Sequence, residues 1–323
     1  MFCLLLLRKF EQAVQGGIGN AMALQALQGL AGVVVGVAVA LVRVGKYLLV
    51  AGRTQLSGEI RGRLQFILVC KHVLCRCLHL EGGHMHTEFF EISSRFCGPP
   101  RSGNGGYTCG RVAKHLRGSV TVRLKAPPPL NTELRLESTE QEARLYSDTT
   151  LVGEAKLAPL DLQVPTGPSF SVAEEAAQSF VGFKIHAFPG CFVCGPNRAP
   201  KDGLRIFPGS IDGSALLAAP WIPHESLADG AGVVQPEFLW SALDCTGAFA
   251  VMPEKEGVAI VLGELTVDLT GTVAVGEPCV VVGWSLGTEG RKRSAGSALY
   301  APGGRLVAAA RAVWIEVPAS TWG

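Results

Sequence analysis

A pattern that occurs twice in the sequence most constrains the fold of this chain. In each copy, a segment compatible with a short helix is followed by segments in which apolar and polar residues alternate, as in half-buried antiparallel strands. In the first copy the helix is expected over 107–116, directly after the glycine-rich loop 102–106. The expected strands of this copy are 120–124, 133–137, 143–146 and 151–157.

The second copy follows a stretch rich in Pro, Gly and Ser at 161–172. A strand is expected at 215–219, and a buried helix at 237–251. The strands after this helix are expected at 259–266, 278–286, 294–300 and 305–317. A helix followed by antiparallel strands, occurring twice, predicts an α+β protein in which each helix is covered by its own sheet.

Composition sets the limits of this prediction. The 323 residues suffice for two domains, and 48% hydrophobic residues favour a globular protein. The predicted divisions are a first folded copy at 85–160, a linker at 161–185 and a second copy at 186–318. The net charge of +2 and a mildly acidic body give no indication of nucleic-acid binding. The ten cysteines have no regular spacing, which favours reduced thiols and a cytoplasmic protein.

Residues 1–84 differ in character from the rest of the chain. The segment 21–42 carries no charge and is long enough to span a bilayer, so a membrane anchor is one interpretation. The other is that this extension is not native protein. Glu-Gly-Gly at 81–83 stands just before Met85, and codons for these residues can form a purine-rich ribosome-binding site. We expect translation to begin at Met85, and no membrane contact for the body that follows.

Several segments resemble the hotdog superfamily of thioesterases. Residues 273–278, 290–300 and 304–312 are similar to the last strands of that fold. The segment from Cys191 to Leu204, which contains Cys-Phe-Val-Cys-Gly-Pro-Asn, is similar to the start of many hotdog thioesterase-like domains. The resemblance covers about residues 88–317. It implies two tandem hotdog folds, each a central helix wrapped by an antiparallel sheet, that form a pseudo-dimer within the chain.

The phenylacetate-pathway type of hotdog thioesterase supplies a more specific comparison. There a His-Gly-Gly tripeptide begins the central helix, and a carboxylate follows about two helical turns later. In the first copy, Asn-Gly-Gly at 104–106 matches the tripeptide, but Ala113 takes the acid position. In the second copy, Asp244 takes the acid position, whereas Gln-Pro-Glu at 235–237 replaces the glycine loop. The resemblance therefore implies one complete site that both copies build, and one incomplete site.

The implied chemistry is hydrolysis of an acyl-CoA thioester. The backbone amides of Gly105 and Gly106, at a helix N-terminus, would polarise the thioester carbonyl and stabilise an oxyanion. Asp244, on an otherwise apolar helix, would activate water as a base or attack the carbonyl itself. Asn104 replaces the family's histidine and cannot titrate, and Asn is also an ordinary helix N-cap. Asp244 has an alternative interpretation as a hydrogen-bonded structural acid.

Other residues are candidates for substrate binding. Ser241 and Thr246 lie near Asp244 on the same predicted helix and are expected to position water or the carboxylate. Trp240 is expected in the core or in the pocket wall. Three basic residues at a predicted strand start are either a solvated charge run or contacts to the phosphates of coenzyme A: Arg291, Lys292 and Arg293.

Two further features are open to a structural or a functional interpretation. Cys191 and Cys194 have the C-x-x-C spacing of a zinc site, but no second pair follows at finger spacing. A turn with two packed thiols is therefore expected, with no metal and no cofactor apart from the coenzyme A of the substrate. His224 and Glu225 precede the second predicted helix and are expected either at a pocket mouth or in an exposed loop.

Two other functions remain open from the sequence. A non-catalytic hotdog protein would bind acyl-CoA or lipid without turnover and would tolerate the loss of Asp244. A hotdog hydratase acting on enoyl thioesters would need an Asp/His pair on one loop and helix, and no histidine stands near Asp244 in the sequence. Association into a homo-oligomer is compatible with any of these functions.

Overall fold

The computed structural model describes residues 85–253 and 255–321. The described residues belong to one compact unit, which contains both expected copies. The membrane-anchor and start-site predictions for residues 1–84 fall outside the described part of the chain. Within that part, no helix combines the length and the apolar character needed to cross a bilayer.

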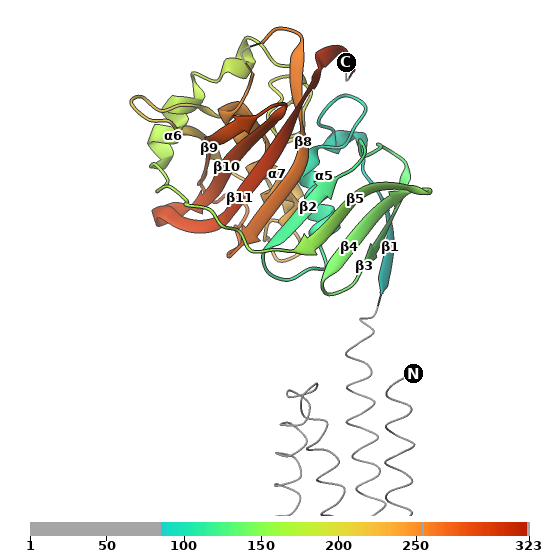
Figure 1. Cartoon of the computed structure of the whole chain (residues 1–323). Coiled ribbons are helices and arrows are strands. Elements are labelled where there is room, and N and C mark those ends of the chain that lie inside the picture. The colour runs from blue at the N-terminus through green and yellow to red at the C-terminus, as the bar shows by residue number, and fades with distance from the viewer. Residues whose placement is uncertain (1–84, 254, 322–323) are drawn as a thin grey trace, which may run out of the picture. The chain divides into compact units, whose positions relative to one another are not determined.

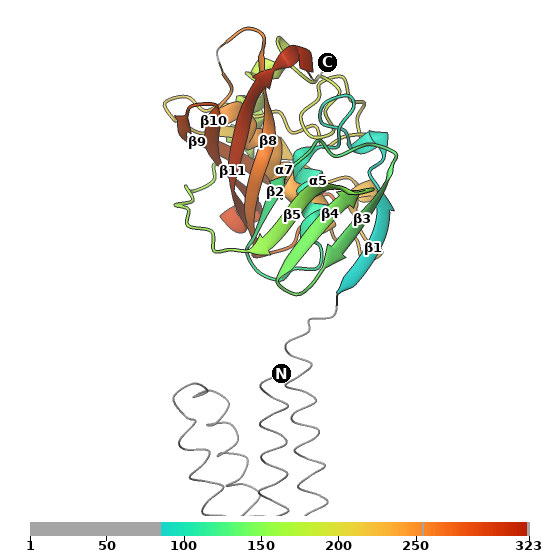
Figure 2. The ribbon, with the colours of Figure 1, turned by 45° about the vertical axis from the view of Figure 1, so that its right-hand side comes forward.

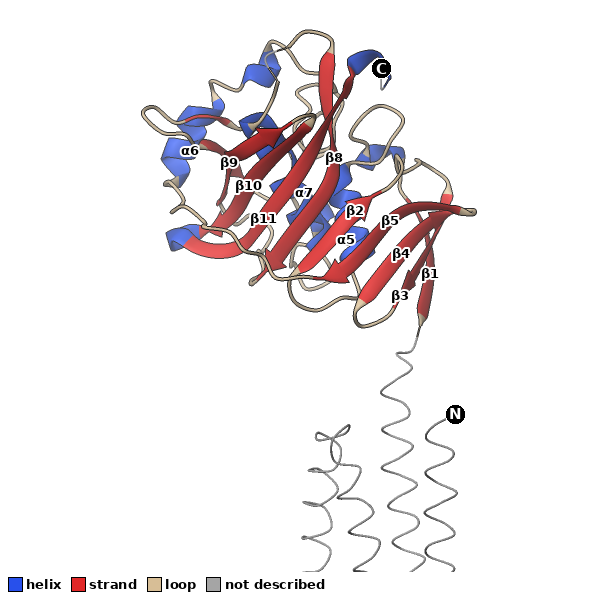
Figure 3. Ribbon diagram, in the orientation of Figure 1, coloured by secondary structure: helices blue, strands red, loops and turns tan. Residues whose placement is uncertain are grey.

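The body of the molecule is one antiparallel sheet of eleven strands with two helices packed along it (Figures 1 and 3). The first copy contributes β1 (His86–Glu91), α5 (Gly105–Ala113), β2 (Val120–Leu124), β3 (Glu133–Ser138), β4 (Glu142–Ser147) and β5 (Thr150–Leu157). The second contributes β6 (Gly209–Ser210), β7 (Leu217–Trp221), α7 (Pro236–Ala250), β8 (Val258–Leu269), β9 (Cys279–Glu289), β10 (Lys292–Ala301) and β11 (Arg305–Pro318).

The two copies share this sheet through the pairing of β2 with β8. The strand order is β1-β3-β4-β5-β2-β8-β11-β10-β9-β7-β6. The strands of the first copy therefore end at β2, and those of the second copy begin at β8. Thr121 of β2 stands opposite Thr266 of β8, and their buried hydroxyl oxygens are 2.7 Å apart. This hydrogen bond satisfies both hydroxyl groups at the junction.

Each helix packs on the strands of its own copy, and the two helices also pack on each other. Helix α5 contacts β2 and β5, whereas α7 contacts β9 and β10. The sheet curves across both helices (Figure 2). The helices run antiparallel, because Gly106 lies against Trp240 and Ser241 while Gly110 lies against Glu237. These contacts confirm the predicted α+β class, but one continuous antiparallel sheet covers both helices, where a separate sheet was expected for each.

The first part of β9, residues 279–284, is buried on both faces, which explains its almost continuous apolar sequence. Cys279 and Val281 belong to the core that contains α7, whereas Val280 and Val282 pack with Ala173 of another helix. This helix is α6 (Phe170–Ala177), and its first turn is capped by Ser169 Oγ, which accepts a hydrogen bond from the Val172 amide. The expected linker 161–185 therefore contains a helix that covers the outer face of the sheet.

The predicted strands of both copies are present with boundaries that differ by only a few residues. No strand was expected at 209–210, where β6 has only two residues, or at 86–91, where β1 lies. Its residues do not alternate cleanly, and most of them are exposed at the edge of the sheet, where only β3 pairs with them. An edge strand buries little of one face, so the hydrophobic pattern that identifies a strand is weak there.

Candidate active site

Asn104 fixes the start of α5 and also contacts the second copy. Its Oδ1 accepts a hydrogen bond from the Tyr107 amide at 2.9 Å, which is the usual N-cap interaction. Its Nδ2 donates to Asp244 Oδ2, also at 2.9 Å. The side chain is 2% exposed. Asn104 therefore serves as the helix cap and as a link to the acid of the other copy at the same time.

Asp244 lies in the middle of α7, directly against the first turn of α5. Its Oδ2 accepts a second hydrogen bond from the backbone N–H of Gly106, at 2.8 Å. Its Oδ1 is buried and has no hydrogen-bond partner among the described residues. The structure thus brings Asp244 into contact with Asn104 and Gly106, which precede it in the sequence by 140 and 138 residues.

The surroundings of Asp244 favour its neutral form. The side chain is 1% exposed, and this burial raises its pKa to about 7. The hydrogen bond from the Gly106 amide opposes the shift, the neighbouring Cys191 adds to it, and the hydrogen bond from Asn104 opposes it. A carboxyl group in this state differs from an ordinary surface aspartate, and perturbed groups of this kind are concentrated at functional sites.

Glycine at position 106 is required by the close approach of the two helices. A Cβ atom there would lie 2.6 Å from Asp244 Cβ and 2.7 Å from the Trp240 carbonyl oxygen. At Gly110, one turn later, a Cβ would lie 2.6 Å from the Glu237 Cα. The close contact is what allows the Gly106 amide to reach the carboxylate. Gly105 instead packs against the side chain of Leu262 on β8.

The other residues predicted on α7 lie close to Asp244 in the chain but make different contacts. Ser241 Oγ donates to the Glu237 carbonyl at 2.7 Å, one turn back along the helix. Thr246 is fully buried, and its Oγ1 has no partner among the described residues. Trp240 is buried at the helix crossing, where its carbonyl oxygen and Cβ face the glycines of α5.

The basic run lies at the β9–β10 hairpin. Arg291 and Lys292 line a small pocket of about 310 Å³ together with Glu289. Arg293 is engaged inside the protein, because its Nε donates to Glu316 at 2.6 Å and its guanidinium donates to the Val251 carbonyl at 3.0 Å. Val251 is the C-cap residue of α7. Arg291 and Lys292 thus remain on the surface, whereas Arg293 ties the sheet to the end of this helix.

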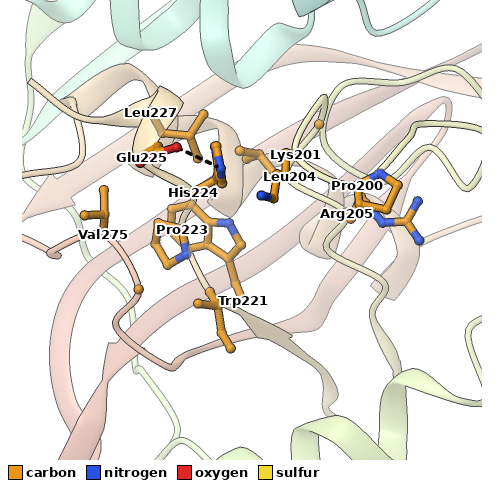
Figure 4. A pocket seen from close by; sticks show the side chains of 13 residues that line it. Pro200, Lys201, Leu204, Arg205, Trp221, Pro223, His224, Glu225, Leu227 and Val275 are labelled. Atoms are coloured by element: carbon orange, nitrogen blue, oxygen red, sulfur yellow. Dashed lines mark ion pairs between the residues drawn. The ribbon is translucent and has the colours of Figure 1, made fainter. Parts of the chain in front are cut away.

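A larger pocket of about 580 Å³ is lined mainly by residues that precede α7 in the sequence, and Figure 4 shows their side chains. His224 and Glu225 contribute to its wall, in agreement with one of the two positions expected for them. The indole of Trp221 and the side chains of Lys201 and Arg205 also line it. Asp244 is not among the lining residues, so the buried carboxyl group and this pocket are separate features of the structure.

Three cysteines form a cluster beside Asp244. Cys191 and Cys194 come from the loop before β6, and Cys245 is the next residue to Asp244 on α7. The Cys191 and Cys245 sulfur atoms are 3.7 Å apart. Hydrogen bonds from the Cys194 and Cys245 thiols lower the pKa of Cys191 against the effect of its burial. Asn104 Nδ2 lies 3.9 Å from the Cys191 sulfur, so the cluster adjoins the site.

Cys245 is the residue at this site that the sequence patterns did not single out. It stands more than fifty residues from Cys191, at no spacing that a metal motif specifies. The only local indication was its place next to the candidate acid. The pairing of the 191–194 loop with α7 depends on the tertiary fold, which spacing along the chain does not encode.

Comparisons with known proteins give the following similarities. No protein-family model matches the sequence, and no curated protein matches it. Among solved structures, a tesB protein of Mycobacterium avium subsp. paratuberculosis is 13% identical with a TM-score of 0.48, over 72% of this chain and 93% of the other. An acyl-CoA thioesterase II of Mycobacterium marinum is 11% identical with a TM-score of 0.45, over 72% and 93%.

A third solved structure is a protein of Alicyclobacillus acidocaldarius that is described as having a hot dog fold. It is 14% identical with a TM-score of 0.43, over 72% of this chain and 93% of the other. The printed descriptions of these three structures name a tesB protein, an acyl-CoA thioesterase II and a protein with a hot dog fold.

Proposed function

We propose that this protein is a tandem hotdog hydrolase of acyl-CoA thioesters with one active site per chain. The observation that carries the proposal is the contact between Asp244 of the second copy and the Gly106 amide of the first, at 2.8 Å. An amide at a helix N-terminus stabilises negative charge on an oxyanion, and a buried carboxylate next to it serves as a base. The two groups required for thioester hydrolysis therefore adjoin each other.

The second potential site lacks the acid and the glycine loop. Pro236 is the first residue of α7 and has no N–H to donate. Glu237, at the position that corresponds to Gly106, is packed against Gly110. Ala113 stands where an acid would be needed. The proposal therefore assigns all turnover to the site that Gly106 and Asp244 form.

In the proposed reaction, the hydrogen bond between the Gly106 amide and Asp244 Oδ2 breaks. The Gly106 amide then donates to the thioester carbonyl oxygen instead. Oδ1 of Asp244, which has no partner within the described structure, then accepts a proton from water as the water oxygen attacks the carbonyl carbon. The carbon–sulfur bond breaks, and the proton passes to the departing thiolate. The products are a carboxylic acid and the free thiol of coenzyme A.

The experiment that tests the proposal is the release of free thiol from a panel of short-chain, long-chain and aromatic acyl-CoA thioesters. We expect the purified full chain to hydrolyse at least one class well above the rate in buffer. Thiol release that is equal with and without the protein, for every member of the panel, would contradict the proposal. The panel also identifies the acyl preference, which the described residues do not specify.

One observation favours a second candidate function, a non-catalytic module that binds acyl-CoA or lipid. The Gly106 amide is already engaged by Asp244, and the carboxyl group is almost inaccessible. In a binding module this contact would only hold the two helices together. Saturable binding of acyl-CoA without thiol release, unchanged in an Asp244→Asn variant, would support the module and contradict the hydrolase.

We further propose that Arg291 and Lys292 contact the phosphates of coenzyme A, because both line the hairpin pocket and Arg293 is engaged elsewhere. We expect the double variant Arg291→Gln/Lys292→Gln to raise KM for acyl-CoA by about 3- to 30-fold, with kcat nearly unchanged, since each lost charged contact is worth about 0.3–1 kcal/mol at an exposed site. An N-acetylcysteamine thioester lacks the phosphates and should be hydrolysed equally by both proteins. An equal KM for acyl-CoA would refute the assignment.

A further inference from the structure

The cysteine cluster has the dimensions of a metal site. Cys191, Cys194 and Cys245 are all buried, and their three sulfur atoms lie within 4.8 Å of one another. In tetrahedral zinc sites the Zn–S distance is about 2.3 Å, which places two sulfur ligands about 3.8 Å apart. The 3.7 Å between the Cys191 and Cys245 sulfur atoms agrees with this separation. A disulfide bond needs about 2.0 Å between its sulfur atoms, and these cysteines are free.

The loop that carries two of the sulfur atoms is already shaped to hold them. The Gly195 amide donates to the Cys191 carbonyl at 2.9 Å and closes a turn around Cys191 and Cys194. A side chain at Gly195 would collide with that carbonyl, since a Cβ would lie 2.4 Å from its oxygen. Hydrogen bonds from the backbone amides of Val193 and Cys194 also lower the pKa of the Cys191 thiol. This arrangement of C-x-x-C with amide donors stabilises thiolate ligands.

The same loop is held in place from outside by the backbone of the first copy and of the following segment. The Phe192 amide donates to the Cys97 carbonyl at 2.8 Å, and the Leu204 amide donates to the Phe192 carbonyl at 2.8 Å. The Phe192 ring packs edge-on against Phe96, with ring centroids 5.0 Å apart. The loop that carries the two sulfur atoms is therefore held in place before any ligand binds, which lowers the entropic cost of binding.

We propose that Cys191, Cys194 and Cys245 bind one thiophilic metal ion, with Zn²⁺ as the expected occupant. Soft thiolate ligands select such ions over Mg²⁺ and Ca²⁺. Within the described residues, no ligand atom of a His, Asp or Glu lies within 4.8 Å of all three sulfur atoms. The fourth coordination position is therefore left for a small exogenous ligand. The proposal departs from the expectation of a metal-free turn, because Cys245 supplies a third sulfur that the sequence spacing did not indicate.

The bound ion would connect the 191–194 loop to α7 at the residue after Asp244. Loss of the ion should therefore loosen the segment that holds the carboxyl group and lower the thermal stability of the protein. The proposed hydrolysis assigns no step to the ion. Metal content and catalytic activity can thus be measured separately.

The test is elemental analysis of the full chain, purified without chelators, together with Cys245→Ser and a matched control, Cys279→Ser. Cys279 is also fully buried but lies outside the cluster. We expect about one zinc per chain in the wild-type protein and in Cys279→Ser, and at least a tenfold loss in Cys245→Ser. Asp244→Asn should retain zinc, which separates this inference from the proposed function. Equal zinc in Cys245→Ser and the wild type would overturn the proposal.

A second measurement keeps the proposal testable if Cys245→Ser fails to fold. Wild-type protein is stripped of metal with a chelator and titrated with Co²⁺, which takes the place of Zn²⁺ and reports on its ligands. We expect one equivalent to produce intense sulfur-to-cobalt charge-transfer bands and the visible bands of tetrahedral coordination, together with a rise in Tm. Cobalt bands without sulfur charge transfer, or no uptake at all, would show that the cluster is only three packed thiols.

Discussion

Replacing Asp244 with Asn is expected to abolish hydrolysis while leaving the fold intact. Asn has nearly the same shape, and its carbonyl oxygen can still accept the hydrogen bond of the Gly106 amide, but it cannot take a proton from water. General-base catalysis typically contributes about 10²- to 10⁴-fold to the rate, so we expect kcat/KM to fall by at least about 10²-fold. The measurement is thiol release with the acyl-CoA that the wild-type protein hydrolyses fastest.

The stability of Asp244→Asn should change in the opposite direction to its activity. Burial of Asp244 opposes its ionisation, so a neutral amide at the same place removes an unfavourable buried charge. We expect an equal or higher Tm, as is common where a buried charge serves function rather than stability. Asp212→Asn is the matched control, because Asp212 is exposed in a turn far along the chain from the site. Hydrolysis that is equal in Asp244→Asn and the wild type would contradict the role of Asp244.

Replacing Gly106 with Ala is expected to reduce both stability and activity. The added methyl group would lie within 3.0 Å of Asp244 Cβ, the Trp240 carbonyl oxygen and the Ser241 Cα, two of which are backbone atoms that cannot rotate away. The helices must therefore separate. Overpacking of this kind costs about 1–3 kcal/mol, which corresponds to a fall in Tm of about 2–12 °C for a domain of this size. Thermal unfolding and thiol release measure the two effects.

Gly230→Ala is the control for Gly106→Ala. A Cβ at Gly230 would meet no atom within 4 Å, so this variant should keep the Tm and the activity of the wild type. Activity in Gly106→Ala should fall further than in other variants with the same loss of Tm, because the displaced amide no longer meets the thioester carbonyl. A Gly106→Ala protein with normal Tm and normal kcat/KM would show that the helix contact is not part of the site.

The helices and strands could largely be predicted from the sequence because they depend on patterns that are local in the chain. Alternation of apolar residues identified the strands of both copies, and the apolar spacing of 237–251 identified the helix that is observed as α7. Asp244 was singled out by the resemblance to hotdog thioesterases, and its role as the acid stays a prediction. The pairing of Asp244 with Gly106 required one further step, the assumption that the two copies form a pseudo-dimer.

Other features could not be predicted because they depend on contacts between distant segments. The Gly106 amide was expected to face a substrate, but in the structure it donates to the carboxylate itself. Nothing in the local sequence around Cys245 indicates that it meets Cys191 and Cys194. The helix α6 begins at the end of the stretch rich in Pro, Gly and Ser, and it packs on the apolar outer face of β9.

The most direct test of one asymmetric site is a crystal structure with an acyl-CoA analogue in which a methylene group replaces the thioester sulfur. This ligand keeps the carbonyl group but cannot be hydrolysed. We expect the carbonyl oxygen within about 3 Å of the Gly106 nitrogen, with the Asp244 carboxylate released from that amide and turned towards the carbonyl carbon. An analogue bound in the pocket that Trp221 and His224 line, with Asp244 still hydrogen-bonded to Gly106, would contradict the account.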